Sequence, residues 1–219
     1  MNRKLVGFLL TLLFCVSPLR ADLFFVETWD ADESGWSGST AELSVSHSGF
    51  GGGSLQGTFA EQIMPGPEVG AFRADGDASG GAYTGDYWAE LSTFAGWQFD
   101  FYAADVLPSS LYARFSDGQN TYQANLLDQL TVVGEWTTVS TPGLDVGLQA
   151  WIGPDGTTGL SNALASVEWM EVRLERNQTI EQDYFMDNFQ VIPEPGTLAL
   201  VLISGLGLAW VRRLHRIAG

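Results

Sequence analysis

Cysteine, lysine and histidine are scarce in this sequence of 219 residues. The single cysteine, Cys15, and the single lysine, Lys4, lie close to the N-terminus, so residues 22–192 contain neither. No disulfide can therefore form within residues 22–192. His47 is the only histidine of this span, and no G-x-S-x-G motif is present, although residues 35–39 (GWSGS) come within one residue of it. Nucleophilic catalysis thus has few candidate residues.

Positive charge is equally scarce. Residues 22–192 carry four arginines against 25 aspartates and glutamates, which gives a net formal charge of −21. Proteins that bind nucleic acid need clustered Lys and Arg to contact phosphates, so nucleic acid is excluded as a partner. Cations, neutral glycans and basic surfaces are compatible with this charge. Two paired acids would suit a glycosidase, but with 25 of them such pairs arise by chance.

The first 21 residues have the order of a secretory signal peptide. Arg3 and Lys4 precede an apolar stretch over residues 5–16, and a short segment ending at Ala21 follows it. We expect cleavage after Ala21. This cleavage would remove Cys15 and leave an exported, cysteine-free protein.

The C-terminus combines two prolines, an apolar segment and a basic end. Residues 197–211 are apolar and are followed by Arg212, Arg213 and Arg216. This predicted transmembrane helix is shorter than the usual ~20 residues, and long arginine side chains that reach the interface can extend it. The positive-inside rule keeps the arginines in the cytoplasm and places the acidic body outside.

The order of these three parts carries a resemblance. Ile192-Pro193-Glu194-Pro195-Gly196, the apolar segment and the basic end resemble the PEP-CTERM sorting signal of Gram-negative bacteria. The resemblance implies that an exosortase, a transpeptidase-like membrane enzyme, recognises Pro193, Glu194 and Pro195 and cleaves near them. It further implies transit through the inner membrane to the cell surface or extracellular matrix, in company with exopolysaccharide. An ordinary single-pass anchor is the alternative for residues 193–219.

Short apolar alternations punctuated by glycine, aspartate and proline predict an all-β fold for residues 22–192. One face of WQFDFYA carries Trp97, Phe99 and Phe101, and VEWMEVRLE places its aliphatic residues opposite its charged ones. The predicted strands cover residues 23–29, 42–47, 54–60, 69–74, 97–103, 111–115, 121–127, 136–141, 146–151, 167–175 and 184–192. Strands of this length and spacing predict two packed antiparallel sheets.

The order of motifs in this span carries a second resemblance. Glu27, then residues 35–36 (GW), 53–55 (GSL), 99–102 (FDFY), 134–136 (GEW) and 184–188 (YFMDN), resembles the β-sandwiches of carbohydrate-binding modules and laminin-B-like domains. The resemblance implies a jelly-roll, galactose-binding-like sandwich that binds polysaccharide without catalysis. It also implies a structural Ca²⁺ held by an early acid and a late aspartate, which correspond to Glu27 and Asp187.

The residues themselves do not decide whether Glu27 and Asp187 bind calcium. A period of two places Glu27 in phase with Phe25 and Trp29, and Asp187 in phase with Phe185 and Phe189. A carboxylate on an apolar face needs a partner, which calcium and backbone carbonyls would supply. The alternative is that both acids lie at strand edges in water.

Aromatic residues in glycine-rich loops are candidates for sugar stacking. A platform for sugar binding is predicted from four aromatic residues in or beside such loops: Tyr83, Tyr87, Trp88 and Trp151. The alternative is that these rings pack at the rim of the sandwich. The tryptophans in strand-like or motif contexts are expected in the core; they are Trp36, Trp97, Trp136 and Trp169. The sequence therefore predicts an exported, non-catalytic protein that binds polysaccharide. A purely structural surface protein and a glycan-active enzyme are the alternatives.

Overall fold

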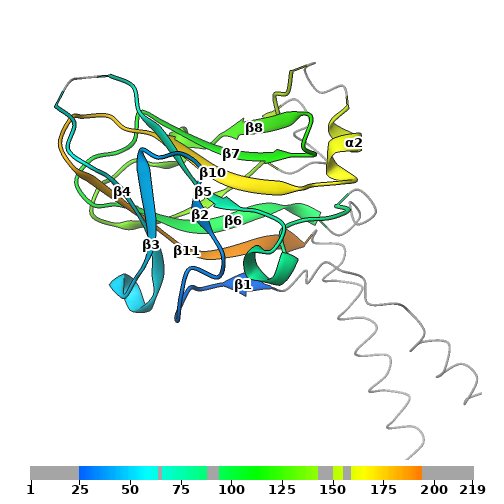
Figure 1. Ribbon diagram of the computed structural model, residues 1–219, viewed down its shortest axis with the longest axis horizontal. Coiled ribbons are helices and arrows are strands. Elements are labelled where there is room, and N and C mark those ends of the chain that lie inside the picture. The colour runs from blue at the N-terminus through cyan, green and yellow to red at the C-terminus, as the bar shows by residue number, and fades with distance from the viewer. Residues whose placement is uncertain (1–24, 64–65, 88–93, 143–149, 155–158, 194–219) are drawn as a thin grey trace, which may run out of the picture.

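The computed structural model describes residues 25–63, 66–87, 94–142, 150–154 and 159–193 (Figure 1). The predicted signal peptide and the predicted sorting tail beyond Pro193 lie outside these residues. The same holds for the predicted spanning segment 197–211. Within the described ranges, no helix combines the length and the hydropathy needed to cross a bilayer.

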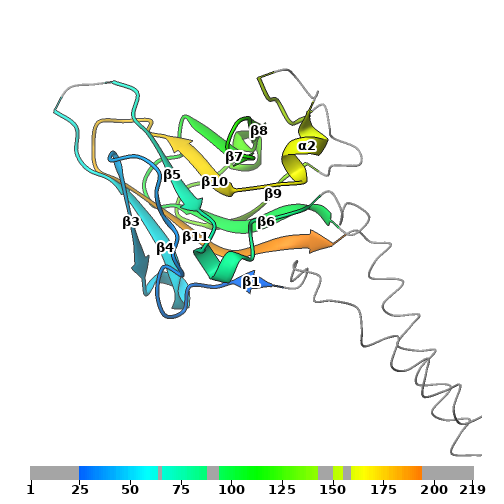
Figure 2. The same cartoon turned by 45° about the vertical axis from the view of Figure 1, so that its right-hand side comes forward.

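The chain folds into two antiparallel sheets, which we call sheet A and sheet B. Sheet A has the order β3-β4-β11-β6-β9, with β1 also paired to β11, and sheet B has the order β2-β5-β10-β7-β8. The strands are β1 (Val26–Glu27), β2 (Ser37–Gly38), β3 (Leu43–Ser48), β4 (Ser54–Phe59), β5 (Val69–Ala74), β6 (Phe94–Ala103), β7 (Ser110–Ser116), β8 (Thr121–Asn125), β9 (Trp136–Ser140), β10 (Trp169–Glu175) and β11 (Gln182–Pro193). Figures 1 and 2 show the two sheets as stacked layers, with sheet B uppermost.

The core lies between the layers and is rich in aromatic rings. Trp97, Phe99 and Phe101 of β6 are fully buried, as their alternation predicted. Met170, Val172 and Leu174 of β10 face them from sheet B and are equally buried. The predicted two-sheet antiparallel sandwich is therefore confirmed, while its finer description as a jelly roll stays a prediction.

Strand β11 organises sheet A because it has neighbours along both edges. Its first half pairs with β4 and its second half with β1, while β6 pairs along its other edge. The pairing with β6 shifts register between Asp187 and Gln190, and Asn188 has a φ of 51°. This β-bulge reverses which face the following side chains occupy.

Short helical turns join several strands and were not predicted. They are η1 (Phe50–Gly52), η2 (Ala78–Gly81), η3 (Leu127–Gln129) and the α-helix α2 (Leu160–Leu164). Helix α2 buries Leu160, Ala163 and Leu164 against the core beside β8 (Figure 1). Residues 146–149 of the predicted strand 146–151 lie outside the described residues.

Candidate functional site

A row of five polar side chains crosses the outer face of sheet B. Glu171 of β10 lies directly opposite Arg73 of β5 and Arg114 of β7. Ser37 of β2 extends the row beyond Arg73, and Gln123 of β8 extends it beyond Arg114. Directly opposed residues of antiparallel strands present their side chains on the same face. We call these five residues the charged row.

The carboxylate of Glu171 fixes the two arginines beside it. Its side chain is only 3% exposed, and it forms ion pairs with Nη1 of Arg114 and, at 4.0 Å, with Nη1 of Arg73. The Nε of Arg73 also donates to Asp75 Oδ1 at 2.8 Å. Burial lowers the pKa of Arg114, and the negative charge of Glu171 offsets part of this effect. The guanidinium groups are therefore held as charged, oriented donors.

An aromatic ring lies next to the charged row. The guanidinium of Arg73 lies 4.2 Å from the centre of the Trp169 ring, and that of Arg114 lies 5.9 Å from it. Trp169 is half-buried, so the prediction that it belongs to the core is wrong. Its position two residues before Glu171 puts it on the outer face, because strand side chains alternate. Three of the four arginines in residues 22–192 lie on this face: Arg73, Arg114 and Arg173.

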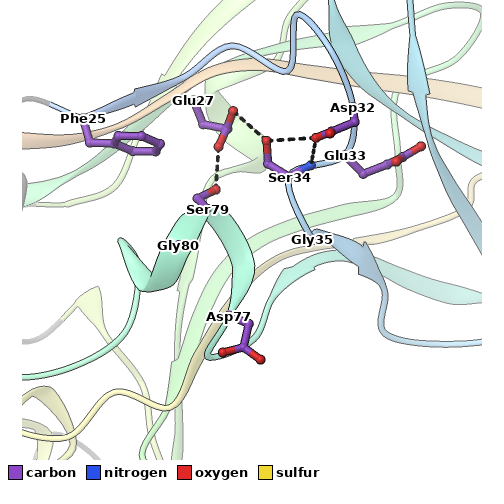
Figure 3. A pocket seen from close by; sticks show the side chains of 9 residues that line it. All are labelled: Phe25, Glu27, Asp32, Glu33, Ser34, Gly35, Asp77, Ser79 and Gly80. Carbon is purple, nitrogen blue, oxygen red and sulfur yellow. Dashed lines mark hydrogen bonds between the residues drawn. The ribbon is translucent and has the colours of Figure 1, made fainter.

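The predicted calcium ligand Glu27 lines a surface pocket at the edge of the sandwich (Figure 3). Its Oε2 accepts a hydrogen bond from Ser79 Oγ at 2.6 Å, and its Oε1 accepts one from Ser34 Oγ at 3.2 Å. Glu27 is 8% exposed, so these hydroxyl donors replace the water that the carboxylate loses. The pocket measures about 770 Å³ and is lined by Phe25, Glu27, Asp32, Glu33, Ser34, Gly35, Asp77, Ser79 and Gly80.

The acids around this pocket do not converge on one point. Figure 3 shows the carboxylates of Glu33 and Asp77 pointing away from Glu27. Asp187 lies on the opposite face of sheet A, because it is paired with outward-facing Asp100, whereas Glu27 is paired with buried Phe189. Among the described residues, no group of three or more His, Cys, Asp or Glu could hold a metal ion. Glu27 and Asp187 therefore do not fit a shared calcium site, and whether the protein binds a structural Ca²⁺ stays a prediction.

The aromatic platform predicted in the glycine-rich loops is wrong for the three of its rings that the structure describes. Tyr83, Tyr87 and Trp151 are at most 4% exposed and belong to the core, while Trp88 lies outside the described residues. Tyr83 packs edge-on against Phe189 and donates its hydroxyl to the Phe189 carbonyl at 3.0 Å. Burial raises the pKa of Tyr83 far above its ordinary value. Such rings cannot stack on a ligand in solvent.

The predicted sorting residues fall mostly outside the described chain. Pro193 is the last residue of β11, where its backbone pairs with that of Phe94. Glu194, Pro195 and the arginines at 212, 213 and 216 lie outside the described residues, so their role stays a prediction.

Replacing Asp187 by asparagine is expected to stabilise the protein at neutral pH. Burial raises the pKa of Asp187, the Asn188 amide opposes the rise, and the charges of Asp100 and Asp30 add to it. Between the ordinary value of ~3.9 and the raised value, the folded state holds the proton more tightly, so stability falls as pH increases. Asp187→Asn should therefore raise the urea midpoint at pH 7 and leave it unchanged at pH 3.

The exposed Asp105→Asn variant controls for the loss of one negative charge in this experiment. An equal gain in both variants at pH 7 would mean that net charge, rather than the environment of Asp187, causes the effect.

Comparisons with known proteins support the fold. No family model matches the chain, and no curated protein matches it. The family 30 carbohydrate-binding module of a cellulosomal cellulase of Clostridium thermocellum has a TM-score of 0.50 and 15% identity, over 78% of this chain and 97% of that one. Another family 30 carbohydrate-binding module has a TM-score of 0.50 and 12% identity, over 77% of this chain and 87% of that one.

A third similar structure is part of a larger enzyme. An exo-β-agarase has a TM-score of 0.52 and 13% identity, but the match covers 77% of this chain and only 24% of the agarase. At these identities the likeness concerns the fold alone. The described chain is thus an all-β, two-sheet sandwich similar to those of carbohydrate-binding modules.

Proposed function

We propose that this chain is an exported, non-catalytic protein of the cell surface or extracellular matrix that binds polysaccharide through the outer face of sheet B. The observation that carries the proposal is the charged row, in which buried Glu171 orients Arg73 and Arg114 beside the Trp169 ring. The likeness of the fold to carbohydrate-binding modules supports the same proposal.

The chemistry of this face suits a sugar polymer. Hydroxyl and carboxylate groups of sugars need donors and acceptors whose positions are fixed before binding, because mobile side chains lose entropy when they are immobilised. Guanidinium groups held by Glu171 supply the donors, and the amide of Gln123 supplies both kinds of group. Arg73 covers one face of the Trp169 ring, so the C–H groups of a pyranose would pack against the part of this half-buried ring that Arg73 leaves exposed.

Export and sorting rest on the two ends of the sequence. The apolar N-terminal segment supports secretion, and the Pro-Glu-Pro tail supports recognition by an exosortase as the partner that processes the protein. Detection of the protein in the outer fraction of its producer, and its retention in the inner membrane when Glu194 is replaced by alanine, would test this part.

Binding to a panel of neutral and acidic polysaccharides tests the site. We expect Trp169→Ala to raise the dissociation constant of the site on sheet B by about tenfold or more, because aromatic rings at binding centres dominate affinity. Isothermal titration with oligosaccharides of the polysaccharide that binds would measure this change in the full-length protein. The variant Ile63→Ala removes a fully exposed apolar side chain from a loop and should leave the constant unchanged.

Two outcomes would contradict the proposal. One is a folded Trp169→Ala variant that binds as tightly as the unchanged protein. The other is an absence of binding to every polysaccharide, which would favour a purely structural surface protein.

A further inference from the structure

A second aromatic surface lies on the opposite side of the molecule. Phe50, Tyr102, Trp136 and Phe185 pack together on the outer face of sheet A, and we call them the outer cluster. Phe50 lies 4.6 Å from Phe185, 4.8 Å from Tyr102 and 5.8 Å from Trp136, measured between ring centres. Trp136 also lies 5.4 Å from Tyr102. The four rings therefore form one continuous cluster, in which Phe185 is buried and Phe50 and Trp136 are exposed.

The outer cluster is not part of the core. Tyr102 lies opposite Trp136 on β9 and Phe185 on β11, and its neighbours Phe101 and Ala103 point inward. Phe50 is 40% exposed and Trp136 is 36% exposed. The outward positions of β3 and β4 hold polar residues without rings instead: Ser44, Ser46, Ser48, Gln56 and Thr58. Large rings left partly in water on a polar face indicate a binding surface.

A glycine turn brings Phe50 over the sheet. Gly51 has a φ of 72° and Gly52 a φ of 115°, which few other residues adopt. A Cβ atom on Gly51 would lie 3.2 Å from Cζ2 of Trp136. The η1 turn is therefore shaped to lie close to the Trp136 ring, so that Phe50 and Trp136 stack with 29° between their planes.

Fixed polar groups lie one step along the strands from the rings. Asp100 is opposite Thr138 on β9 and Asp187 on β11, directly beyond Tyr102 and its two aromatic partners. Asp100 accepts hydrogen bonds from Thr138 Oγ1 at 2.6 Å and from Asn188 Nδ2 at 2.9 Å. These carboxylates keep acceptor capacity for hydroxyl groups. Aromatic rings beside oriented acceptors suit a sugar, whose C–H face packs and whose hydroxyls donate.

The charge of this face selects the kind of sugar. Three of the arginines in residues 22–192 lie on sheet B, and Arg176 is buried, so none of the four contributes to the outer face of sheet A. Asp100, Asp183 and Asp187 make the face acidic. An acidic polymer would be repelled here, whereas a neutral one would not.

We propose that the outer cluster is a second polysaccharide site, specific for a neutral polymer, on the face opposite the charged row. The proposed second site depends on the outer cluster alone. The linking of two polysaccharide chains, described next, rests also on the proposed function of sheet B. With one site on each outer face, a single molecule links two polysaccharide chains. Linkage of this kind gains from multivalency and turns a binding protein into a cross-linker of the matrix.

The experiment uses the full-length protein, kept in mild detergent because of its apolar tail, with a soluble neutral β-glucan and its hexasaccharide as probes. Titration with the hexasaccharide counts sites, and light scattering with the polymer detects cross-linking. We expect two sites and a rise in scattering for the unchanged protein. Trp136→Ala should keep one site and lose the rise in scattering, while Ile63→Ala should behave as the unchanged protein.

The two proposals fail in different ways. If Trp169→Ala removes all binding and Trp136→Ala changes nothing, the site on sheet B stands and the outer cluster is not a sugar site. If Trp136→Ala removes all binding and Trp169→Ala changes nothing, the outer cluster stands and the site on sheet B does not bind neutral glucan. The proposed site on sheet B then falls if the unchanged protein also shows no binding to acidic polysaccharides that Trp169→Ala weakens. Self-association without glucan that Trp136→Ala abolishes would identify a second copy of the chain as the occupant and overturn the inference. Circular dichroism of each variant establishes that it is folded.

Discussion

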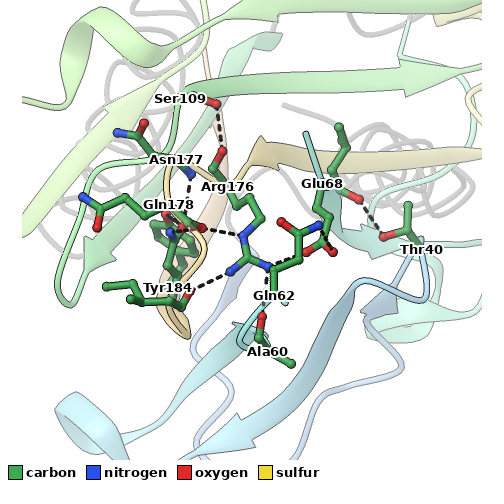
Figure 4. Close-up of polar contacts among 12 residues, drawn as sticks. Thr40, Ala60, Gln62, Glu68, Ser109, Arg176, Asn177, Gln178 and Tyr184 are labelled. Atoms are coloured by element: carbon green, nitrogen blue, oxygen red, sulfur yellow. Dashed lines mark hydrogen bonds and ion pairs between the residues drawn. The ribbon is translucent and has the colours of Figure 1, made fainter. Parts of the chain in front are cut away.

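Replacing Arg176 by methionine is expected to lower the free energy of unfolding by about 3 kcal/mol, the lower end of the cost of breaking a buried ion pair, because the side chain of its partner Glu68 is 22% exposed. Arg176 is 5% exposed and pairs with Glu68. It also donates to the carbonyls of Ala60 at 2.9 Å, Gln178 at 2.6 Å and Ile180 at 2.6 Å (Figure 4). Methionine has a similar length but would leave these acceptors without a donor.

The position of Arg176 explains why the effect should be global. Residues 60–68 connect β4 of sheet A to β5 of sheet B, and residues 176–181 connect β10 of sheet B to β11 of sheet A. Arg176 binds both connections, so it holds the two crossings between the sheets together. A typical domain has only about 5–15 kcal/mol of stability, so the loss is a large fraction of the total.

Arg173→Met is the matched control for this prediction. Arg173 lies three residues earlier on the outer face of β10, and its side chain makes no hydrogen bond or ion pair with the described residues. Its replacement should change stability by no more than about 0.5 kcal/mol. Urea unfolding of both variants gives the comparison. Equal midpoints would show that the Arg176 network does not stabilise the fold.

Most of the strand framework could be predicted from the sequence because alternation is a local property. The β5 prediction coincides with the observed strand, and β10 presents its charged residues outward as expected. The same alternation places Trp169 on the outward face with Glu171. The prediction that Trp169 is a core residue did not take this alternation into account. Which strands meet could not be predicted: Arg73 and Glu171 are far apart in sequence, and only the sheet order brings them together.

The errors at Asp187 and at the loop aromatics have different physical causes. The bulge at Asn188 breaks the period of two, so Phe185 faces outward and Phe189 inward although their spacing suggests one face. Tyr83 lies in a glycine-rich stretch, which is typical of exposed loops, but its ring is buried against Trp36 and Phe189 of the core. Composition cannot distinguish a loop that covers a core from one that lies in solvent.

Replacing Glu171 by glutamine is expected to weaken both the fold and the binding face. The neutral amide keeps the size of the side chain, yet it removes the carboxylate that Arg73 and Arg114 share. Arg73 then keeps Asp75 as an anion, whereas Arg114 keeps no ion pair among the described residues. We expect a loss of about 1.5–3 kcal/mol in the free energy of unfolding, the range for hydrogen bonds to charged groups. Glu171 does not contact the sugar in our proposal; it acts by positioning the two guanidinium groups.

Glu175→Gln is the matched control, since Glu175 lies on the same face of β10 and only its Oε2 contact with Ser110 Oγ, at 3.5 Å, would change. Urea unfolding should show a small effect for Glu175→Gln and a large one for Glu171→Gln. Measurements in high salt then distinguish two effects of Glu171, the orientation of the guanidinium groups and the suppression of repulsion between Arg73 and Arg114. The repulsion is screened in ~1 M salt, where the Debye length is about 3 Å, whereas the orientation is not restored by salt. If repulsion between the arginines dominates, high salt restores the stability of Glu171→Gln, yet polysaccharide binding stays weak because the guanidinium groups remain unfixed. Recovery of both stability and binding in high salt would show that Glu171 only neutralises charge and does not orient the arginines.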